Sequence, residues 1–257
     1  MNVLVFDIET VPDVAGARRL GDFQGLDDAA VAEALFAQRR QATGGEFLRH
    51  HLHRVVAISL VLREGEQLRV WSLGRPESGE AEIIARFFAG LEKYTPTLVS
   101  WNGCGFDLPV LHYRALVHGI AAPRYWENGD GHREFRFNNY TNRYHQRHTD
   151  LMDVLSGFQP RAAAPLEEIA TLMGLPGKMG MSGARVWEAF LGGDIIGIRD
   201  YCETDVLNTY LVWLGFERMR GVIDRPRHQE ECQRLRDWLA AQERPHFSAF
   251  LQAWKPT

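Results

Sequence analysis

The segment FDIET, residues 6–10, ends the short apolar and β-branched stretch 1–8, which predicts a β-strand. Residues i and i+2 of a strand point to the same face, ~6.6 Å apart, so the side chains of Asp7 and Glu9 project together. Like charges this close are unfavourable unless a cation lies between them, and carboxylate oxygens favour Mg²⁺ or Mn²⁺. Taken alone the pattern is a weak signal, because many strands simply end in solvated acids.

Outward from this segment, the chain begins with strands and then alternates strands with helices, which predicts a single mixed α/β domain over residues 1–257. The polar stretch 13–50 is expected to be an insertion of unassigned role. We expect a hairpin of strands at 55–62 and 67–73, and further strands at 97–101 and 148–155. Helices are expected at 27–41, 78–94, 108–118, 166–173, 198–220 and 227–242.

Composition limits the cellular context without deciding the activity. The chain has 257 residues, of which 45% are hydrophobic, and its longest uninterrupted apolar run, residues 55–62, falls far short of the ~18 residues of a membrane span. No secretory signal is visible at the N-terminus. Three cysteines are too few and odd in number for a disulfide framework. We therefore expect a cytoplasmic protein with no membrane partner.

The net charge does not indicate a nucleic-acid partner, since it is formally −4. Any polyanion would need a local basic patch or metal ions. Residues 124–147 are a candidate patch, with five arginines against three acids and six interleaved aromatic rings. Rings that stack on bases beside cations that meet phosphates are typical of single-strand binding. The alternative is an aromatic-rich hairpin or loop that packs on the domain.

A second motif, WNGCGFD at residues 101–107, runs from a strand through two glycines into a helix. Asp107 stands where a helix N-cap is expected, immediately before Leu108 and Pro109. The two glycines could equally let the backbone approach a bound strand closely. Both interpretations can hold together.

A third motif, YCETD at residues 201–205, lies inside the long predicted helix. The i, i+4 spacing places Tyr201 and Asp205 on one face, so that a phenol and a carboxylate can address the same point. Asp200 and Glu203 should point elsewhere. By itself this motif is better interpreted as an ordinary polar helix face with a tyrosine at its edge.

Together the three motifs resemble, in type and order, those of the DEDDy branch of the DnaQ-like 3′–5′ exonucleases. More closely, they are similar to the proofreading domain of family B DNA polymerases in its stand-alone, predicted-exonuclease form, over residues 3 to about 215. The sister branch has a histidine five positions before the last aspartate. Asp200 occupies that position here, which favours the tyrosine branch. Because about fifty residues follow Asp205, we expect any proofreading to occur in trans.

The resemblance implies an α/β, RNase H-like fold with a mixed central sheet flanked by helices. It implies a metal-dependent 3′–5′ exonuclease acting on single-stranded DNA ends, with two divalent cations, Mg²⁺ or Mn²⁺. The implied metal ligands are Asp7, Glu9, Asp107 and Asp205, and Tyr201 would orient the attacking water and the scissile phosphate. Thr10, Asn102 and Phe106 would hold the terminal nucleotides.

Two alternatives to this activity stay open. One is a 3′–5′ exoribonuclease of the same branch, since nothing in the sequence reads or rejects a 2′-hydroxyl. The other is a catalytically silent nucleic-acid-binding module. The partner is expected to be the 3′ end of single-stranded DNA, or RNA, with a DNA polymerase or repair complex acting alongside.

Several further signals are given ordinary interpretations. His50, His51 and His53 lack accompanying ligands at zinc spacing and are expected to be surface or turn histidines. Residues 174–178 resemble a phosphate loop, but Leu172 and Met179 break the Walker A pattern. An alternative for this loop is a position near the active face, with Lys178 contacting a phosphate.

The remaining acids and thiols are treated in the same way. Asp150 and Asp153 are expected to be solvated, with a supporting carboxylate as the alternative. Cys104, Cys202 and Cys232 have no partner pattern that would make one of them a nucleophile, and burial is the expected fate of all three.

Overall fold

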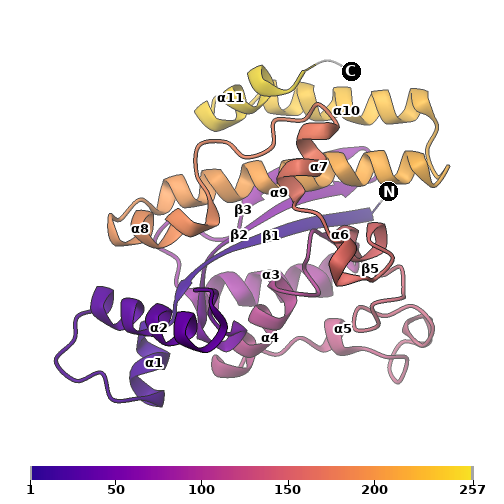
Figure 1. The fold of residues 1–257 in the computed structure, drawn as a ribbon. Coiled ribbons are helices and arrows are strands. Elements are labelled where there is room, and N and C mark those ends of the chain that lie inside the picture. The colour runs from indigo at the N-terminus through magenta and orange to yellow at the C-terminus, as the bar shows by residue number, and fades with distance from the viewer. Residues whose placement is uncertain (1, 256–257) are drawn as a thin grey trace.

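The computed structural model describes residues 2–255, which are built around a five-stranded sheet of order β3-β2-β1-β4-β5 (Figure 1). The central strand β1 pairs antiparallel with β2 and parallel with β4, while β5 runs parallel to β4. The strands are β1 (Asn2–Pro12), β2 (His53–Glu64), β3 (Gln67–Ser72), β4 (Thr97–Ser100) and β5 (His148–Asp150). The expected mixed sheet and its β2–β3 hairpin are confirmed; Met1, in the expected first strand, lies outside the described residues.

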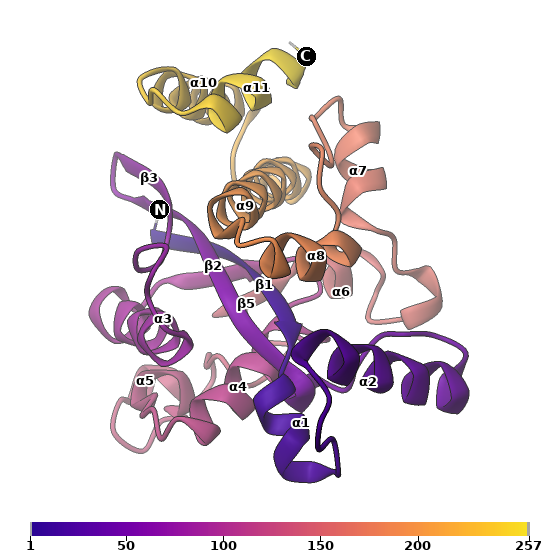
Figure 2. The same cartoon turned by 90° about the vertical axis from the view of Figure 1, so that its left-hand side faces the viewer.

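Helices cover both faces of the sheet (Figure 2). On one face lies α9 (Ile195–Met219), with α10 (Arg225–Ala240) and α11 (Pro245–Ala253) beyond it. On the other face lie α3 (Glu80–Tyr94), α4 (Asp107–Val117) and α5 (Pro123–Trp126). None of the helices between residues 2 and 255 is long and apolar enough to cross a membrane.

Alternation along β1 decides which way its acids point. Leu4, Phe6 and Ile8 are buried in the core on the α3 and α4 side. Val3 and Val5 are buried in the core on the α9 side. Because successive strand residues face opposite sides, Asp7 and Glu9 belong to the α9 face of the sheet.

The strand expected over residues 148–155 is confirmed only as far as Asp150 and is wrong beyond it. The chain leaves β5 at Asp150, whose carboxylate accepts the backbone N–H groups of Met152 and Asp153 and so caps α6 (Leu151–Leu155). A side chain that satisfies the free donors of a helix start favours the helix over a continued strand. Further short elements are α7 (Leu166–Leu172), α8 (Val186–Leu191) and the 3₁₀ turns at His50–Leu52, Arg133–Phe135, Pro160–Ala162 and Gly183–Arg185.

The stretch 13–50 contains two helices, the one expected at 27–41 and a shorter one before it. Asp13 caps α1 (Val14–Leu20), and Asp27 caps α2 (Asp28–Thr43) as its sequence position predicts. The two helices share a small core of their own with Leu48, against which Trp187 packs from α8. The stretch is therefore anchored beside the end of β1.

Residues 124–147, all of which the structure describes, contain no strand, so the hairpin interpretation is wrong and the loop interpretation holds. Tyr125, Phe135 and Tyr140 are buried, and the Tyr140 hydroxyl donates a 2.6 Å hydrogen bond to the Pro96 carbonyl. The Arg147 guanidinium lies 4.1 Å from the centre of the Phe135 ring. Half of the aromatic set and at least two of the arginines, Arg124 and Arg147, therefore serve packing, while Trp126, Phe137 and Tyr144 stay exposed.

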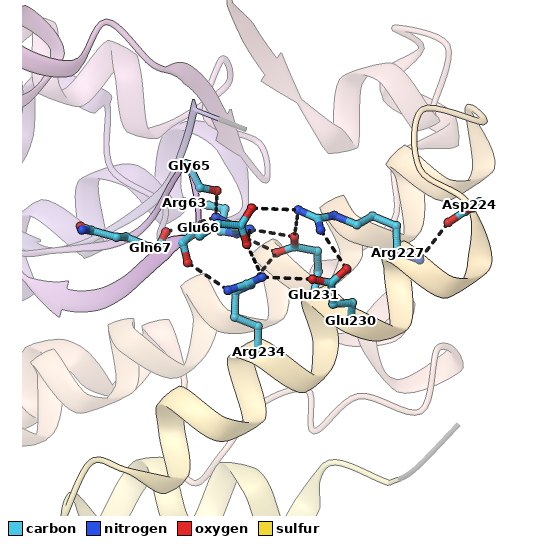
Figure 3. Close-up of polar contacts among 9 residues, drawn as sticks. All are labelled: Arg63, Gly65, Glu66, Gln67, Asp224, Arg227, Glu230, Glu231 and Arg234. Carbon is cyan, nitrogen blue, oxygen red and sulfur yellow. Dashed lines mark hydrogen bonds and ion pairs between the residues drawn. The ribbon is translucent and has the colours of Figure 1, made fainter.

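A buried ion pair ties α10 to the β2–β3 hairpin (Figure 3). Arg63 on β2 donates from Nε and Nη2 to the two carboxylate oxygens of Glu231, at 2.7 and 2.8 Å, and both side chains are fully buried. Arg227 and Arg234 extend the network by pairing with Glu231 and with Glu66 of the hairpin turn. The C-terminal helices are thereby fixed to the edge of the sheet away from β5.

Candidate active site

The first two candidate acids lie near the end of the central strand. Oxygens of Asp7 and Glu9 and the sulfur of Cys202, on α9, all lie within 4.8 Å of one another. The Cys202 Sγ is 3.6 Å from Asp7 Oδ2 and 3.5 Å from the Asp7 carbonyl oxygen. The overlying α9 thus lies against the carboxylates of β1.

Electrostatic interactions connect four acidic side chains near the end of β1. Burial raises the pKa of Asp7 well above its usual value, and the charges of Asp107, Glu9 and Asp205 raise it further. Burial and the charges of Asp205 and Asp107 likewise raise the pKa of Glu9. Charges affect one another's pKa mainly at short range, and more so in a poorly solvated site. The structure therefore brings Asp7, Glu9, Asp107 and Asp205 together from β1, α4 and α9.

Asp107 is the first residue of α4 rather than its N-cap, so the cap interpretation is wrong; Phe106 occupies the cap position. The Asp107 carboxylate instead accepts a 3.2 Å hydrogen bond from the backbone N–H of Ile8. Burial raises the pKa of Asp107 to about 7, although this hydrogen bond acts to lower it. Asp107 is therefore held against β1 at Ile8, the residue between the strand's two acids.

On α9, Tyr201 and Asp205 lie one turn apart and face the same group of acids. Burial raises the pKa of Asp205 to about 6, while hydrogen bonding from Tyr201 acts to lower it. Burial and the charges of Asp205 and Glu9 raise the pKa of the Tyr201 phenol far above its usual value. Asp200 and Glu203 point away, as expected, and pair with Arg244.

One lysine, Lys178, has a positive charge that acts on two of these four acids. Lys178 lies in the loop between α7 and α8, and its charge acts to lower the pKa of both Glu9 and Asp205. Its amino group is 3.6 Å from a Glu167 carboxylate oxygen and is partly exposed. This position agrees with the alternative interpretation of the loop as one that reaches the active face.

Asp150 is not the solvated acid that was expected; it fits the alternative, a supporting carboxylate. It is buried, and its two oxygens accept the backbone N–H groups of Asn102 and Cys104 at 2.9 and 2.8 Å. Asn102 has a φ of 63°, in the left-handed region that costs a non-glycine residue energy. Asp150 thus holds the strained turn of the second motif, and its place at the end of a strand next to β4 is the signal that could have found it.

His53 was also misinterpreted, since it is buried rather than a surface or turn residue. Its Nδ1 lies 2.8 Å from Thr10 Oγ1, and its ring centre lies 5.1 Å from that of Phe106. His50 makes the equivalent link to the second motif, with Nε2 2.8 Å from the Gly105 carbonyl oxygen. The histidine stretch therefore joins the candidate substrate-binding residues of two motifs.

A cavity of about 700 Å³ opens beside the acids. Glu9, Thr10, Phe106 and Lys178 line it together with Phe47, from the stretch that follows α2. Phe47 is 59% exposed, and its ring centre lies 5.4 Å from that of Phe106. A nucleotide-sized space with aromatic walls thus adjoins the carboxylates. Asn102, the third candidate substrate-binding residue, lies in the turn before α4 rather than in the cavity lining.

The donor set fits divalent cations of the magnesium type. Four carboxylates supply hard oxygen ligands. Burial raises the pKa of all four, and for Asp7 and Glu9 the charges of neighbouring acids raise it further, so a bound cation would stabilise their charged forms. The neighbouring Cys202 is no soft competitor at neutral pH, because burial raises the pKa of its thiol well above the usual value.

Comparison with known proteins supplies the family. A family model described as a predicted 3′–5′ exonuclease related to the exonuclease domain of PolB matches residues 45–254. The chain belongs to this exonuclease family. The match covers more than half of the chain and contains Asp107, Tyr201 and Asp205, while Asp7 and Glu9 precede it. No curated protein matches the chain.

Membership of the exonuclease family confirms the resemblance and the expected α/β, RNase H-like fold. It identifies the chain's activity as that of a nuclease, a hydrolase that takes nucleic acid as substrate. It also implies dependence on a divalent metal, in agreement with the acidic group at the end of β1.

Proposed function

We propose that this chain is a 3′–5′ exonuclease of the DEDDy type that removes nucleotides from single-stranded DNA ends by two-metal hydrolysis. The observation that carries the proposal is the gathering of acids at the end of β1: carboxylate oxygens of Asp7 and Glu9 lie within 4.8 Å of each other, Asp107 is bonded to the intervening Ile8, and the charge of Asp205 acts on Asp7. These acids come from three elements far apart in sequence, so their meeting is not a local accident of one motif.

Asp7, Glu9, Asp107 and Asp205 are the proposed metal ligands. When bound, a pair of Mg²⁺ or Mn²⁺ ions would make the attacking water more nucleophilic and stabilise the leaving 3′-oxygen. The protein's own part is to hold the four carboxylates in one poorly solvated place. The Ile8 N–H fixes Asp107 from the strand side, which limits how far that carboxylate can swing.

Tyr201 acts as a hydrogen-bond donor rather than as a base. Its pKa is raised far above neutrality, so the phenol keeps its proton throughout the physiological range. From one helical turn before Asp205 it is placed to orient the attacking water and the scissile phosphate. Lys178 adds the positive charge that a phosphodiester needs beside four acids.

The terminal nucleotide is proposed to lie in the cavity beside Glu9, with its base against the Phe106 ring. Thr10 meets its sugar, and Asn102 holds the backbone at the glycine-containing turn. Exposed aromatic residues support the preference for single strands, since stacking needs an unpaired base. We further propose a cytoplasmic role in DNA proofreading or repair, in trans to a DNA polymerase.

The decisive experiment uses purified full-length chain with Mg²⁺ or Mn²⁺ and 5′-labelled oligonucleotides. Single- and double-stranded DNA and RNA are compared, each beside the Asp7→Ala variant. A ladder shortening from the 3′ end of single-stranded DNA, absent in Asp7→Ala, is expected. Preferred cleavage of RNA would transfer the proposal to an exoribonuclease, and full turnover by Asp7→Ala would refute the ligand assignment.

Tyrosine is tested separately from the metal ligands. Tyr201→Phe removes the hydroxyl but leaves all four carboxylates, so it should lower kcat by about 10- to 100-fold, less than Asp205→Ala does. An unchanged rate in Tyr201→Phe would remove the phenol from the mechanism.

A further inference from the structure

Two hydrogen bonds fix the state of the His53 ring. Its Nε2 lies 3.3 Å from the Leu48 carbonyl oxygen, and its Nδ1 lies 2.8 Å from Thr10 Oγ1. A carbonyl oxygen can only accept, so Nε2 must carry the hydrogen. Burial lowers the pKa of His53 to about 4, which leaves a single ring hydrogen at neutral pH. The Nδ1 atom is therefore an acceptor.

The Thr10 hydroxyl must then donate its only hydrogen to His53 Nδ1. What the Thr10 oxygen offers to any other partner is lone pairs alone. Thr10 and His53 both line the cavity beside Glu9, where a bound nucleotide end would lie. A neighbouring group in that cavity gains a hydrogen bond from Thr10 only if it is itself a donor.

We propose that His53 is a positioning residue that makes Thr10 an acceptor only, so that the site selects nucleic-acid ends carrying a 3′-hydroxyl, a donor, over ends carrying an acceptor there. This inference rests on the proposed exonuclease activity and names a determinant of which ends it accepts. A 3′-phosphate or other acceptor-only end would place oxygen or fluorine lone pairs against those of Thr10, which is repulsive and leaves both groups without a partner.

The aromatic neighbours of His53 allow a substitution that removes Nδ1 but keeps a ring in the cavity wall. The His53 ring sits against Phe47, with ring centres 5.3 Å apart, and against Phe106. His53→Phe keeps an aromatic ring in this cluster and removes the Nδ1 acceptor. The Thr10 hydroxyl is then free to turn its hydrogen toward the cavity. His51→Phe is the matched control, because His51 is exposed, two residues away, and packs on Tyr113 instead.

The experiment compares kcat/KM for oligonucleotides ending in a 3′-hydroxyl, a 3′-amino group or a 3′-fluorine. Fluorine is close to hydroxyl in size but cannot donate, and all three groups are remote from the scissile bond. Wild type and His51→Phe should prefer hydroxyl and amino ends over the fluoro end by about 10- to 100-fold. In His53→Phe the preference should fall to within about threefold, mainly through recovered cleavage of the fluoro end.

Other outcomes separate this inference from the activity itself. An equal hydroxyl-to-fluoro ratio in wild type and His53→Phe would overturn it while leaving the exonuclease intact. If wild type cleaves none of the DNA or RNA substrates, the proposed activity fails. In that case the hydroxyl-to-fluoro ratio of binding affinities, measured by fluorescence anisotropy with Ca²⁺, tests the role of His53.

Two further measurements guard against a misfolded variant. Thr10→Val removes the oxygen altogether and should also abolish the preference. In wild-type protein, ¹⁵N spectra of the histidine rings at pH 7 should show His53 protonated at Nε2 and bare at Nδ1. A proton on Nδ1 would contradict the inference directly.

Discussion

The backbone N–H of Ile8 donates to the Asp107 carboxylate across a separation of 99 residues, and so locks the first turn of α4 to the strand that carries Asp7 and Glu9. Asp107→Asn keeps an acceptor for this hydrogen bond, whereas Asp107→Ala loses it. Both variants should lose at least about 100-fold in metal-dependent hydrolysis, since each removes a carboxylate ligand.

The two substitutions should differ in thermal stability. Without divalent ions, Asp107→Ala should unfold about 2–4 °C below Asp107→Asn, because a buried N–H left unpaired costs ~1 kcal/mol. Thermal unfolding followed by circular dichroism measures the gap. Equal melting temperatures would mean that the Ile8 hydrogen bond contributes nothing to the fold.

Burial of the acids, together with the charges that act on Asp7 and Glu9, should make the metal-free protein sensitive to pH. A carboxyl whose pKa is higher in the folded chain than in the unfolded chain binds its proton more tightly when folded. Its contribution to stability is therefore full at low pH and lost as the pH rises through the folded value, about 7 for Asp107. The buried histidines His53, His112 and His148, with pKa values lowered to about 4, act in the opposite direction between about pH 4 and 6.5.

A difference between variants isolates the acids from the histidines. Without divalent ions, Asp7→Asn should melt about 2–4 °C above wild type at pH 8, where the removed charge is most repulsive. The gap should shrink at pH 5, where the wild-type acids bind protons. Mg²⁺ should raise the melting temperature of wild type more than that of Asp7→Asn. A gap that stays constant between pH 5 and 8 would argue against the coupling.

Lys178 should set the lower edge of the pH range of activity. Its charge lowers the pKa of Glu9 and Asp205, so Lys178→Gln should let both acids hold protons to higher pH. Hydrolysis should fall by about threefold to tenfold at pH 6 and by less at pH 8.5. Lys93→Gln, on α3 at the other face of the sheet, is the matched control. A uniform loss across the pH range would assign Lys178 to substrate binding alone.

The buried pair in Figure 3 should matter far more to stability than its exposed neighbour. Glu231→Gln leaves the fully buried Arg63 with only the exposed Glu66 carboxylate, 3.6 Å away, as counter-charge and should cost ~3–5 kcal/mol in the free energy of unfolding. Glu230→Gln, one residue earlier and solvent-accessible, should cost less than ~1 kcal/mol. Chemical denaturation of both variants measures the difference. A loss of unfolding free energy in Glu231→Gln as small as that in Glu230→Gln would show that the buried pair contributes little to stability.

Long elements with a clear period were predictable from sequence. The β-branched residues of β1, the apolar stripe of α3 and the extended α9 each carry enough repeats to reveal their type. The short helices α1 and α8 have too few turns to show a period, so both escaped prediction. The start of α11 did carry a signal, Pro245 followed by Phe247 and Phe250 three residues apart, that was overlooked.

The candidate site shows the same division. Three motifs predicted which acids would meet, and the structure brings those acids together, although the catalytic roles remain predictions. What the sequence could not show is the support that depends on distant partners. Asp150 holds the Asn102 turn from 48 residues away, and His53 meets Thr10 from 43 residues away. For Asp150 the only signal is its place at the end of a strand, and for His53 no local pattern distinguishes the side chain from a solvated one.

Because Tyr201 and Asp205 sit on α9, the constellation of acids cannot close until most of the chain has been made. A nascent polypeptide that has emerged only as far as α8 holds Asp7, Glu9 and Asp107 without their last carboxylate. Ribosome-bound fragments are thus expected to be harmless to nearby nucleic acid. Under the proposed ligand assignment, hydrolysis therefore begins only after α9 has packed on β1.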